Sequence, residues 1–222
     1  MLLEQAVKQG RERVGLSSDK PKLPAESLIR FWSNTVQSCP DKPAFSCLGQ
    51  TLSYGEVDQL SRRIASYLQK DLGLKAGDRI AIQLPNLIQY PAIALAAWHI
   101  GLVVVNTNPM YSVRELIHQF NDAGVKAVFV LDKFYSTLLE ARPNTPIEHV
   151  ILVRALDLLP MPKKAIGGLL MRLTGRWTPV KAGDWIPFSQ LLKSGCIFQA
   201  YSATLNDICT LQYTGGTTGA SK

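Results

Sequence analysis

Hydrophobic residues along the chain follow two spacings, one typical of buried strands and the other typical of helices. Short, nearly continuous apolar runs indicate buried strands at 79–84, 102–106, 127–131, 149–153 and 208–213. Stretches with apolar residues at every third or fourth position indicate helices over 26–39, from 53 to about 73, over 87–100, from 112, and over 134–142 and 188–193. Weaker strand signals fall at 44–48 and 51–52. This alternation predicts an α/β fold, with a mostly parallel sheet flanked by helices.

Two of the expected helices begin with a capping box. Ser53 is followed three residues later by Glu56, and Ser112 is followed by Glu115 in the same way. In this arrangement the serine oxygen accepts from a backbone amide of the first turn, and the glutamate reaches back to the serine amide. The helix after Ser53 carries one apolar stripe, made of Val57, Leu60, Ile64 and Leu68.

An insertion at about 157–185 interrupts the alternation of strands and helices. We expect an amphipathic helix over Lys163–Trp177, because apolar residues recur there at helical spacing, and a basic one, because no acidic residue lies between Pro160 and Ala182. Its apolar positions are Ile166, Leu169, Leu170, Leu173 and Trp177, and its cations are Lys163, Lys164, Arg172 and Arg176. Such a helix can lie on an anionic membrane. It can equally be a helical insertion that packs on the surface of its own domain.

Composition and charge narrow the class of partner. The 222 residues are 46% hydrophobic and 18% charged, as in an ordinary globular α/β protein, and carry a net charge of +7. A basic protein favours acidic partners such as nucleotides, coenzyme A or anionic lipid. Nucleic acid is not expected, because the chain has no basic arm and no basic patch interleaved with aromatic residues.

Cysteine usage and hydropathy point to a cytoplasmic protein without a membrane span. The four cysteines form no C-x-x-C pair, and the three histidines do not cluster, so we expect reduced thiols and no zinc site. No acid, lysine or arginine occurs over 80–113, but the apolar core of this stretch is too short for a transmembrane helix. We therefore expect a buried helix followed by a buried strand there.

The richest chemistry lies in the last ten residues, from Tyr213 to Lys222. Three glycines and three threonines follow a strand-like run, and the segment ends in a lysine. Glycines let the backbone approach a ligand, successive amides can form an anion-binding nest, and the lysine adds positive charge. These features suit a polyphosphate, although a polar surface loop could have the same composition. The pattern is not a Walker A loop, which needs Gly-Lys followed by Ser or Thr.

The order of residues in this segment resembles the phosphate-binding signature of the acyl-adenylate-forming enzymes. That signature reads Tyr or Phe, Thr, Ser or Gly, Gly-Thr-Thr-Gly, two variable residues and Lys, and each fixed position is matched here. The segments 51–58, 77–86 and 101–116 are also similar to this superfamily, and 101–116 resembles the bacterial long-chain fatty acyl-CoA synthetases in particular. The resemblance covers the chain from about residue 26 to its end.

The resemblance implies a ligase that activates a long-chain fatty acid with ATP and Mg²⁺ and then transfers the acyl group to coenzyme A. It assigns phosphate contacts to Thr214, Gly215, Gly216, Thr217, Thr218, Gly219 and Lys222. Thr214 is also the expected contact to magnesium. Residues 1–25 would be a surface segment, and 26–222 the amino-terminal portion of an AMP-binding domain that ends at the phosphate loop. We expect a cytoplasmic protein, which the basic helix Lys163–Trp177 could hold peripherally on the inner face of the cell membrane. The resemblance also makes a homodimer possible.

Two other functions remain as alternatives to the fatty acyl-CoA ligase. An acyl-adenylate ligase could deliver its product to a carrier protein or another acceptor in place of coenzyme A. The chain could also be a non-catalytic module that associates with membranes, for which the basic helix is the only support. If the chain is a fragment of a ligase, we expect it to be inactive alone, because the resemblance places the adenine, ribose and coenzyme A sites beyond Lys222.

Overall fold

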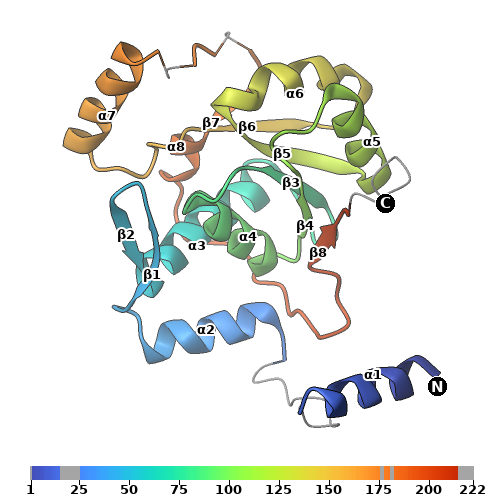
Figure 1. The fold of residues 1–222 in the computed structure, drawn as a ribbon. Coiled ribbons are helices and arrows are strands. Elements are labelled where there is room, and N and C mark those ends of the chain that lie inside the picture. Colours follow the sequence, from blue (N-terminus) through green and yellow to red (C-terminus); the bar gives the residue numbers. More distant parts are fainter. Residues whose placement is uncertain (1, 16–25, 176–177, 181–182, 215–222) are drawn as a thin grey trace.

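Parallel strands form the central sheet of the molecule (Figure 1). The computed structural model describes residues 2–15, 26–175, 178–180 and 183–214. Six strands lie in the order β7-β6-β5-β3-β4-β8, and every neighbouring pair is parallel. They are β3 (Arg79–Gln83), β4 (Val103–Asn106), β5 (Val125–Leu131), β6 (His149–Val153), β7 (Ile186–Pro187) and β8 (Thr210–Gln212). The predicted α/β class and mostly parallel sheet are confirmed.

Helices cover both faces of this sheet. One face packs against α3 (Tyr54–Lys70), α4 (Gln89–His99) and α8 (Phe188–Leu191), with α2 (Leu28–Ser38) outside them. The other face packs against α5 (Val113–Ala123) and α6 (Tyr135–Ala141). Successive residues of a strand point to opposite faces, so Ile80 and Ile82 join the first cluster while Ala81 joins the second. This double burial explains why the strands are almost wholly apolar.

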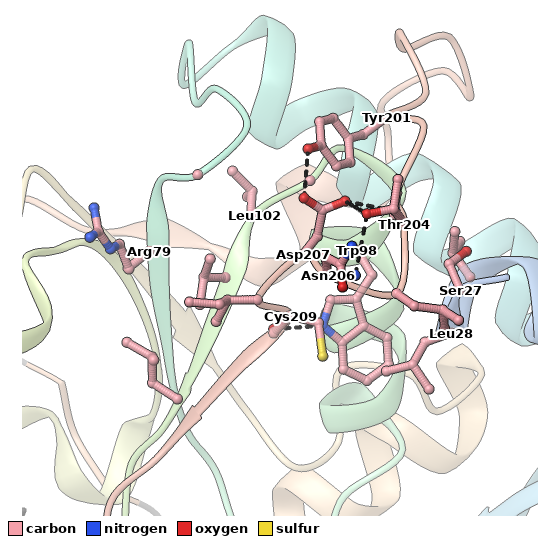
Figure 2. Close-up of a pocket in the computed structure, with 18 residues that line it drawn as sticks. Ser27, Leu28, Arg79, Trp98, Leu102, Tyr201, Thr204, Asn206, Asp207 and Cys209 are labelled. Atoms are coloured by element: carbon pink, nitrogen blue, oxygen red, sulfur yellow. Dashed lines mark hydrogen bonds between the residues drawn. The ribbon is translucent and has the colours of Figure 1, made fainter. Parts of the chain in front are cut away.

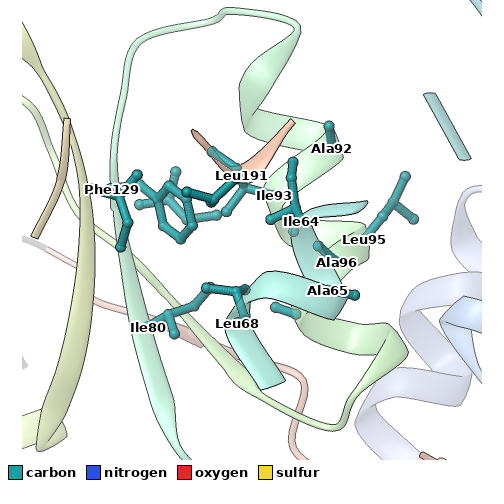
Figure 3. Packing of buried hydrophobic residues seen from close by; sticks show 14 of the residues in the cluster. Ile64, Ala65, Leu68, Ile80, Ala92, Ile93, Leu95, Ala96, Phe129 and Leu191 are labelled. Atoms are coloured by element: carbon teal, nitrogen blue, oxygen red, sulfur yellow. The ribbon is translucent and has the colours of Figure 1, made fainter. Parts of the chain in front are cut away.

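The larger core cluster joins α3 and α4 to the sheet (Figure 3). Ile64 and Leu68 of α3 are fully buried, as are Ile93 of α4 and the strand residues Ile80 and Phe129. Burying one such side chain stabilises the fold by roughly 1.5–3 kcal/mol. The apolar stripe predicted for the helix after Ser53 therefore faces the core.

Both predicted capping boxes are present. The Glu56 amide donates to Ser53 Oγ at 3.3 Å, and the Ser53 amide donates to Glu56 Oε2 at 2.7 Å. Ser112 and Glu115 repeat the arrangement at the start of α5. The α5 helix ends at Gly124, whose φ of 63° is the left-handed conformation that glycine adopts without strain.

Some elements differ from the sequence prediction. A helix α1 (Leu2–Arg13) was not predicted, because residues 1–25 were expected to be a surface segment; its residues 5–10 are exposed. The strand β7 was also missed, since it has two residues and one of them is proline. The weak strand signals become an antiparallel hairpin, β1 (Pro43–Cys47) and β2 (Gln50–Ser53), outside the main sheet. Short 3₁₀ turns, Asp132–Phe134 and Arg142–Asn144, flank α6.

The basic helix of the insertion is present as α7 (Met161–Leu173), which begins two residues earlier than predicted and ends before Arg176 and Trp177. Those two residues lie outside the described part of the chain. The stretch without charge becomes the buried helix α4 and strand β4, as expected. Among the described helices, none has both the length and the apolar character needed to cross a bilayer.

Candidate functional site

The strand β8 leads the chain to the carboxyl edge of the sheet, where the candidate phosphate loop begins. It runs parallel to β4, with Gln212 opposite Asn106 in the register. Open α/β sheets bind ligands at the carboxyl ends of their strands, so this edge is the expected position for a site. Of the residues predicted to contact phosphate, the structure describes Thr214, which is exposed and lies two residues beyond the end of β8. Gly215, Gly216, Thr217, Thr218, Gly219 and Lys222 lie outside the described residues.

A polar hollow of about 590 Å³ opens beside the end of β8. It lies at the carboxyl ends of β3, β4 and β8, and α4 and α5 contribute one residue each. Its lining consists of Ile82, Asn86, Tyr90, Asn106, Thr107, Asn108, Tyr111, Glu115, Gln212 and Tyr213. The sequence analysis placed Asn106 at the end of a strand and did not predict that Asn106 and Asn108 would share a cavity with residues next to the loop.

A chain of side-chain hydrogen bonds crosses this hollow. The Tyr90 hydroxyl of α4 donates to Asn106 Oδ1, and Asn106 Nδ2 donates to Gln212 Oε1 at 2.6 Å. The backbone carbonyl of Asn106 accepts from Gln119 Nε2 of α5 at 3.0 Å. Burial raises the pKa of Tyr90, so its hydroxyl stays protonated and able to donate at neutral pH.

On the other face of β8, Tyr213 is joined to α5. Its hydroxyl donates to Asp122 Oδ2, and its ring packs against the α5–α6 cluster together with Leu211. Burial and the neighbouring Asp122 carboxylate raise the pKa of Tyr213 to about 12. The hydroxyl is therefore a donor throughout the physiological pH range, and the carboxylate remains its acceptor.

A second cavity, of about 450 Å³, lies at the opposite edge of the sheet, near the start of β8 (Figure 2). There Trp98 Nε1 donates to the Cys209 carbonyl at 2.9 Å, and the Tyr201 ring covers Gly101. A Cβ on Gly101 would lie 2.6 Å from that ring, so the close approach requires glycine. The Asp207 carboxylate accepts from the hydroxyls of Thr204 and Tyr201. These side chains bond to one another, so this cavity secures the entry to β8 and is the weaker candidate for chemistry.

Metal-ligating side chains do not cluster in the described part of the chain. No three residues of the His, Cys, Asp and Glu types gather there as a metal site. Two carboxylates near Tyr213 are already hydrogen-bonded: Glu115, which lines the same hollow, to Ser112, and Asp122 to Tyr213 itself.

Comparisons with known proteins identify the relatives of this chain. The model of the AMP-binding enzyme family matches residues 32–222. A long-chain-fatty-acid–CoA ligase of Escherichia coli O6:H1 is 38% identical over 200 residues, which are 89% of this chain and 36% of the relative. The Salmonella typhimurium ligase of the same name is 36% identical over 221 residues, with 95% and 39% covered. The chain thus spans less than half the length of these relatives.

Solved structures show the same fold. An anthranilate CoA ligase in complex with anthranoyl-AMP superimposes with a TM-score of 0.73 at 16% identity, over 90% of this chain and 34% of that one. A long-chain-fatty-acid-CoA ligase from Archaeoglobus fulgidus gives a TM-score of 0.68 at 21% identity, over 90% and 36%. The family match covers the strands, the hollow and the whole candidate loop, so the chain belongs to the AMP-binding enzyme family.

Proposed function

We propose that the protein containing this chain is a long-chain-fatty-acid–CoA ligase. The observation that carries the proposal is the loop sequence Tyr213–Lys222 directly after β8, at the carboxyl edge of a parallel sheet. Curated relatives that share 36–38% of the residues over most of this chain are named as ligases of that kind. Because the chain spans 36–39% of their length, the activity is proposed for the whole protein.

The proposed reaction has two steps. An oxygen of the fatty carboxylate attacks the α-phosphorus of ATP, the bond to the β-phosphate bridge breaks, and pyrophosphate leaves. The coenzyme A thiolate then attacks the acyl carbon, and AMP departs with the bonding electrons. The contribution of this chain is to hold charge, since the departing pyrophosphate develops negative charge beside the loop. Backbone amides, threonine hydroxyls and an ammonium aimed at those oxygens would stabilise it.

Each predicted site residue has a role in this scheme. The amides of Gly215, Gly216 and Gly219, the hydroxyls of Thr217 and Thr218, and the Lys222 ammonium would contact the β- and γ-phosphates. Thr214 would contact phosphate and a magnesium ion. The ion would supply positive charge to the phosphate oxygens. The exposure of Thr214, next to Tyr213 of the hollow's lining, is consistent with this role.

Acyl transfer from ATP to coenzyme A by the whole protein tests the proposal. The protein encoded by the gene that contains these residues is incubated with ATP, Mg²⁺, coenzyme A and fatty acids of graded chain length. We expect acyl-CoA and AMP to form with long-chain acids in preference to short ones. The second candidate function is an acyl-adenylate ligase that delivers to a carrier protein, and an acyl carrier protein offered as the acceptor tests it. A fatty acid–[acyl-carrier-protein] ligase of Streptomyces coeruleorubidus, 32% identical over 57% of this chain, supports that candidate. Formation of acyl-AMP without transfer to coenzyme A would contradict the proposal.

Peripheral contact with an anionic membrane is a further part of the proposed function. The apolar stripe of α7 faces solvent: Ile166, Leu169, Leu170 and Leu173 are 59–76% exposed. The inward side of the helix instead carries Lys164, which pairs with Asp157 at 3.4 Å, together with glycines. Figure 1 shows α7 at the periphery, apart from the helices that cover the sheet.

The positive charge of α7 favours a membrane surface with anionic lipids. The segment between Pro160 and Ala182 has cations and no acid, so an anionic lipid surface complements it while the apolar stripe enters the interface. By this proposal the protein is cytoplasmic and peripheral on the inner face of the cell membrane. A homodimer is proposed from the family resemblance alone, and light scattering of the whole protein would test it.

Vesicle co-sedimentation tests the membrane contact. The whole protein should sediment with vesicles that contain phosphatidylglycerol and much less with phosphatidylcholine alone. Glutamate at Lys163, Lys164, Arg172 and Arg176 should abolish sedimentation. The matched control places glutamate at four exposed cations elsewhere, Arg30, Lys42, Lys70 and Lys75, with the same change in net charge. Equal sedimentation of the two variants would contradict the contact. Failure of the unmodified protein to sediment with anionic vesicles would also contradict it.

A further inference from the structure

The strand that leads into the candidate loop is short and has little backbone support. The three residues of β8 stand at the end of the strand order, and within the described residues β4 is the strand they pair with. A strand this short, hydrogen-bonded along one edge, restrains the direction of the next residues only weakly. Side chains at its exit therefore have a large influence on where Thr214 and the following residues stand.

Gln212 is held on the α4 side of the sheet. Its Oε1 accepts from Asn106 Nδ2 at 2.6 Å, and the other end of that amide accepts from Tyr90. Asn106 is itself fixed from the opposite face, because Gln119 donates to its carbonyl at 3.0 Å and is 1% exposed. Asn106 is thus held by both layers of helices, through its side chain by Tyr90 and through its backbone by Gln119, and its side-chain amide in turn holds Gln212.

Tyr213 is held on the α5 side of the sheet. Consecutive residues in an extended chain point to opposite faces, so Gln212 and Tyr213 reach different helices. The Tyr213 hydroxyl donates to Asp122 of α5, and the ring packs in the cluster formed by α5 and α6. The two residues that precede Thr214 are therefore attached to opposite sides of the molecule.

We propose that these two attachments form a clamp that sets the direction in which the chain leaves β8 and so positions the phosphate loop. We define the clamp as Tyr90, Asn106 and Gln212 on one side and Asp122 and Tyr213 on the other. Its members are positioning residues, since they act on the loop and not on the substrate. This inference rests on the proposed function, because the loop must hold phosphate for its direction to affect catalysis. Misplacement of a catalytic group by about 1 Å can cost on the order of 100-fold in rate.

Both sides of the clamp restrain the chain where it leaves β8, so each side should partly compensate for loss of the other. Loss of one hydrogen bond, through Tyr90→Phe or Tyr213→Phe in the whole protein, should lower kcat/KM for ATP by about fivefold. The double variant should lose at least about fiftyfold, more than the product of the single losses, because neither attachment then remains. The KM for the fatty acid should change by less than about twofold in each variant.

A matched control removes the same atom from an uninvolved tyrosine. Tyr135 of α6 is buried in the cluster that also receives Tyr213, and its hydroxyl has no hydrogen-bond partner within the described residues. Tyr135→Phe should leave kcat/KM for ATP and the melting temperature unchanged. A double clamp variant with wild-type kcat/KM for ATP, or one that merely lowers the melting temperature and the yield of active protein, would overturn the proposal.

Hydrogen exchange separates failure of the clamp from failure of the proposed function. In the double variant the amides of 212–214 should exchange faster than in the unmodified protein, whether or not the protein has ligase activity. Unchanged exchange there would overturn the clamp by itself. An unmodified protein without fatty-acid-dependent chemistry would refute the proposed function, and the exchange measurement would still report on the clamp.

Discussion

Two amphipathic helices of this protein, α3 and α7, show opposite uses of the same sequence pattern. Each carries apolar residues at helical spacing, and both were predicted as helices for that reason. In α3 the stripe residues Val57, Ile64 and Leu68 are fully buried against α4 and the sheet. In α7 the stripe residues Ile166, Leu169, Leu170 and Leu173 are all exposed. An apolar stripe therefore predicts that a helix has a face to be covered, but it does not predict what covers that face.

The residues on the inward side of α7 explain why its apolar stripe faces solvent, whereas that of α3 faces the core. Gly167 lies against Leu156, and a Cβ there would come within 3.1 Å of that side chain, so a larger residue would require Leu156 to shift. Gly168 meets nothing within 4 Å, and a cavity of about 320 Å³ remains between the helix and the segment that carries Arg154 and Asp157. The contact of α7 with the domain is loose, whereas α3 is closely packed.

The largest effect that this comparison predicts is a difference in stability between two variants, each with one leucine replaced by alanine. Leu68→Ala in α3 should lower the free energy of unfolding by about 3 kcal/mol, because it leaves a cavity in a closely packed core. Leu170→Ala in α7 should change it by less than about 0.5 kcal/mol, since Leu170 is 59% exposed. Urea denaturation of both variants measures the difference. Similar losses would show that the α7 stripe is buried within the protein.

A smaller expected effect is the pH dependence of stability that comes from Asp58, a buried carboxylate of α3. Burial opposes ionisation of Asp58, but its contacts with His99, Arg62 and Trp32 outweigh burial and lower its pKa to about 2. Trp32 Nε1 and Arg62 Nε donate to this carboxylate at 3.0 and 2.6 Å. Its pKa is thus lower in the folded than in the unfolded state, so its stabilising contribution is complete above about pH 4.

That contribution should be lost as the pH falls from about 4 toward 2, by an amount on the order of 2 kcal/mol. Comparison of the unfolding free energy of the unmodified protein with that of Asp58→Asn across this range measures it. The variant should be less stable at neutral pH, and the gap should close in acid. A gap that stays constant from neutral pH to pH 2 would show that the carboxylate is not ionised preferentially in the folded state.

The strands that are buried between the two layers of helices could be predicted from the sequence. The apolar runs of β3 to β6 and the boxes at Ser53 and Ser112 use local signals, so they could be read directly. The loop at Tyr213–Lys222 was predicted from the order of its residues, and the structure describes Tyr213 and Thr214 of it.

The contacts around the loop could not be predicted from local signals. Asn106 and Gln212 are more than a hundred positions apart in the chain, and Tyr213 reaches Asp122 from a similar separation. Each of these residues alone fits an ordinary strand end, turn or helix surface. Only the parallel register of β4 with β8 brings Asn106 and Gln212 together. The direction of the α7 stripe was unpredictable for the same reason, since its local pattern matches that of α3.

Fatty-acid-dependent exchange of pyrophosphate into ATP is the most direct test of the central claim that this chain carries the phosphate loop of an acyl-activating enzyme. The unmodified whole protein should catalyse the exchange only when a long-chain fatty acid is present. Lys222→Ala should lower the rate by about 100-fold while fatty-acid binding persists. Lys193→Ala, at an exposed lysine outside the polar hollow, should leave the rate unchanged. Exchange that is independent of fatty acid, or undiminished in Lys222→Ala, would contradict the account.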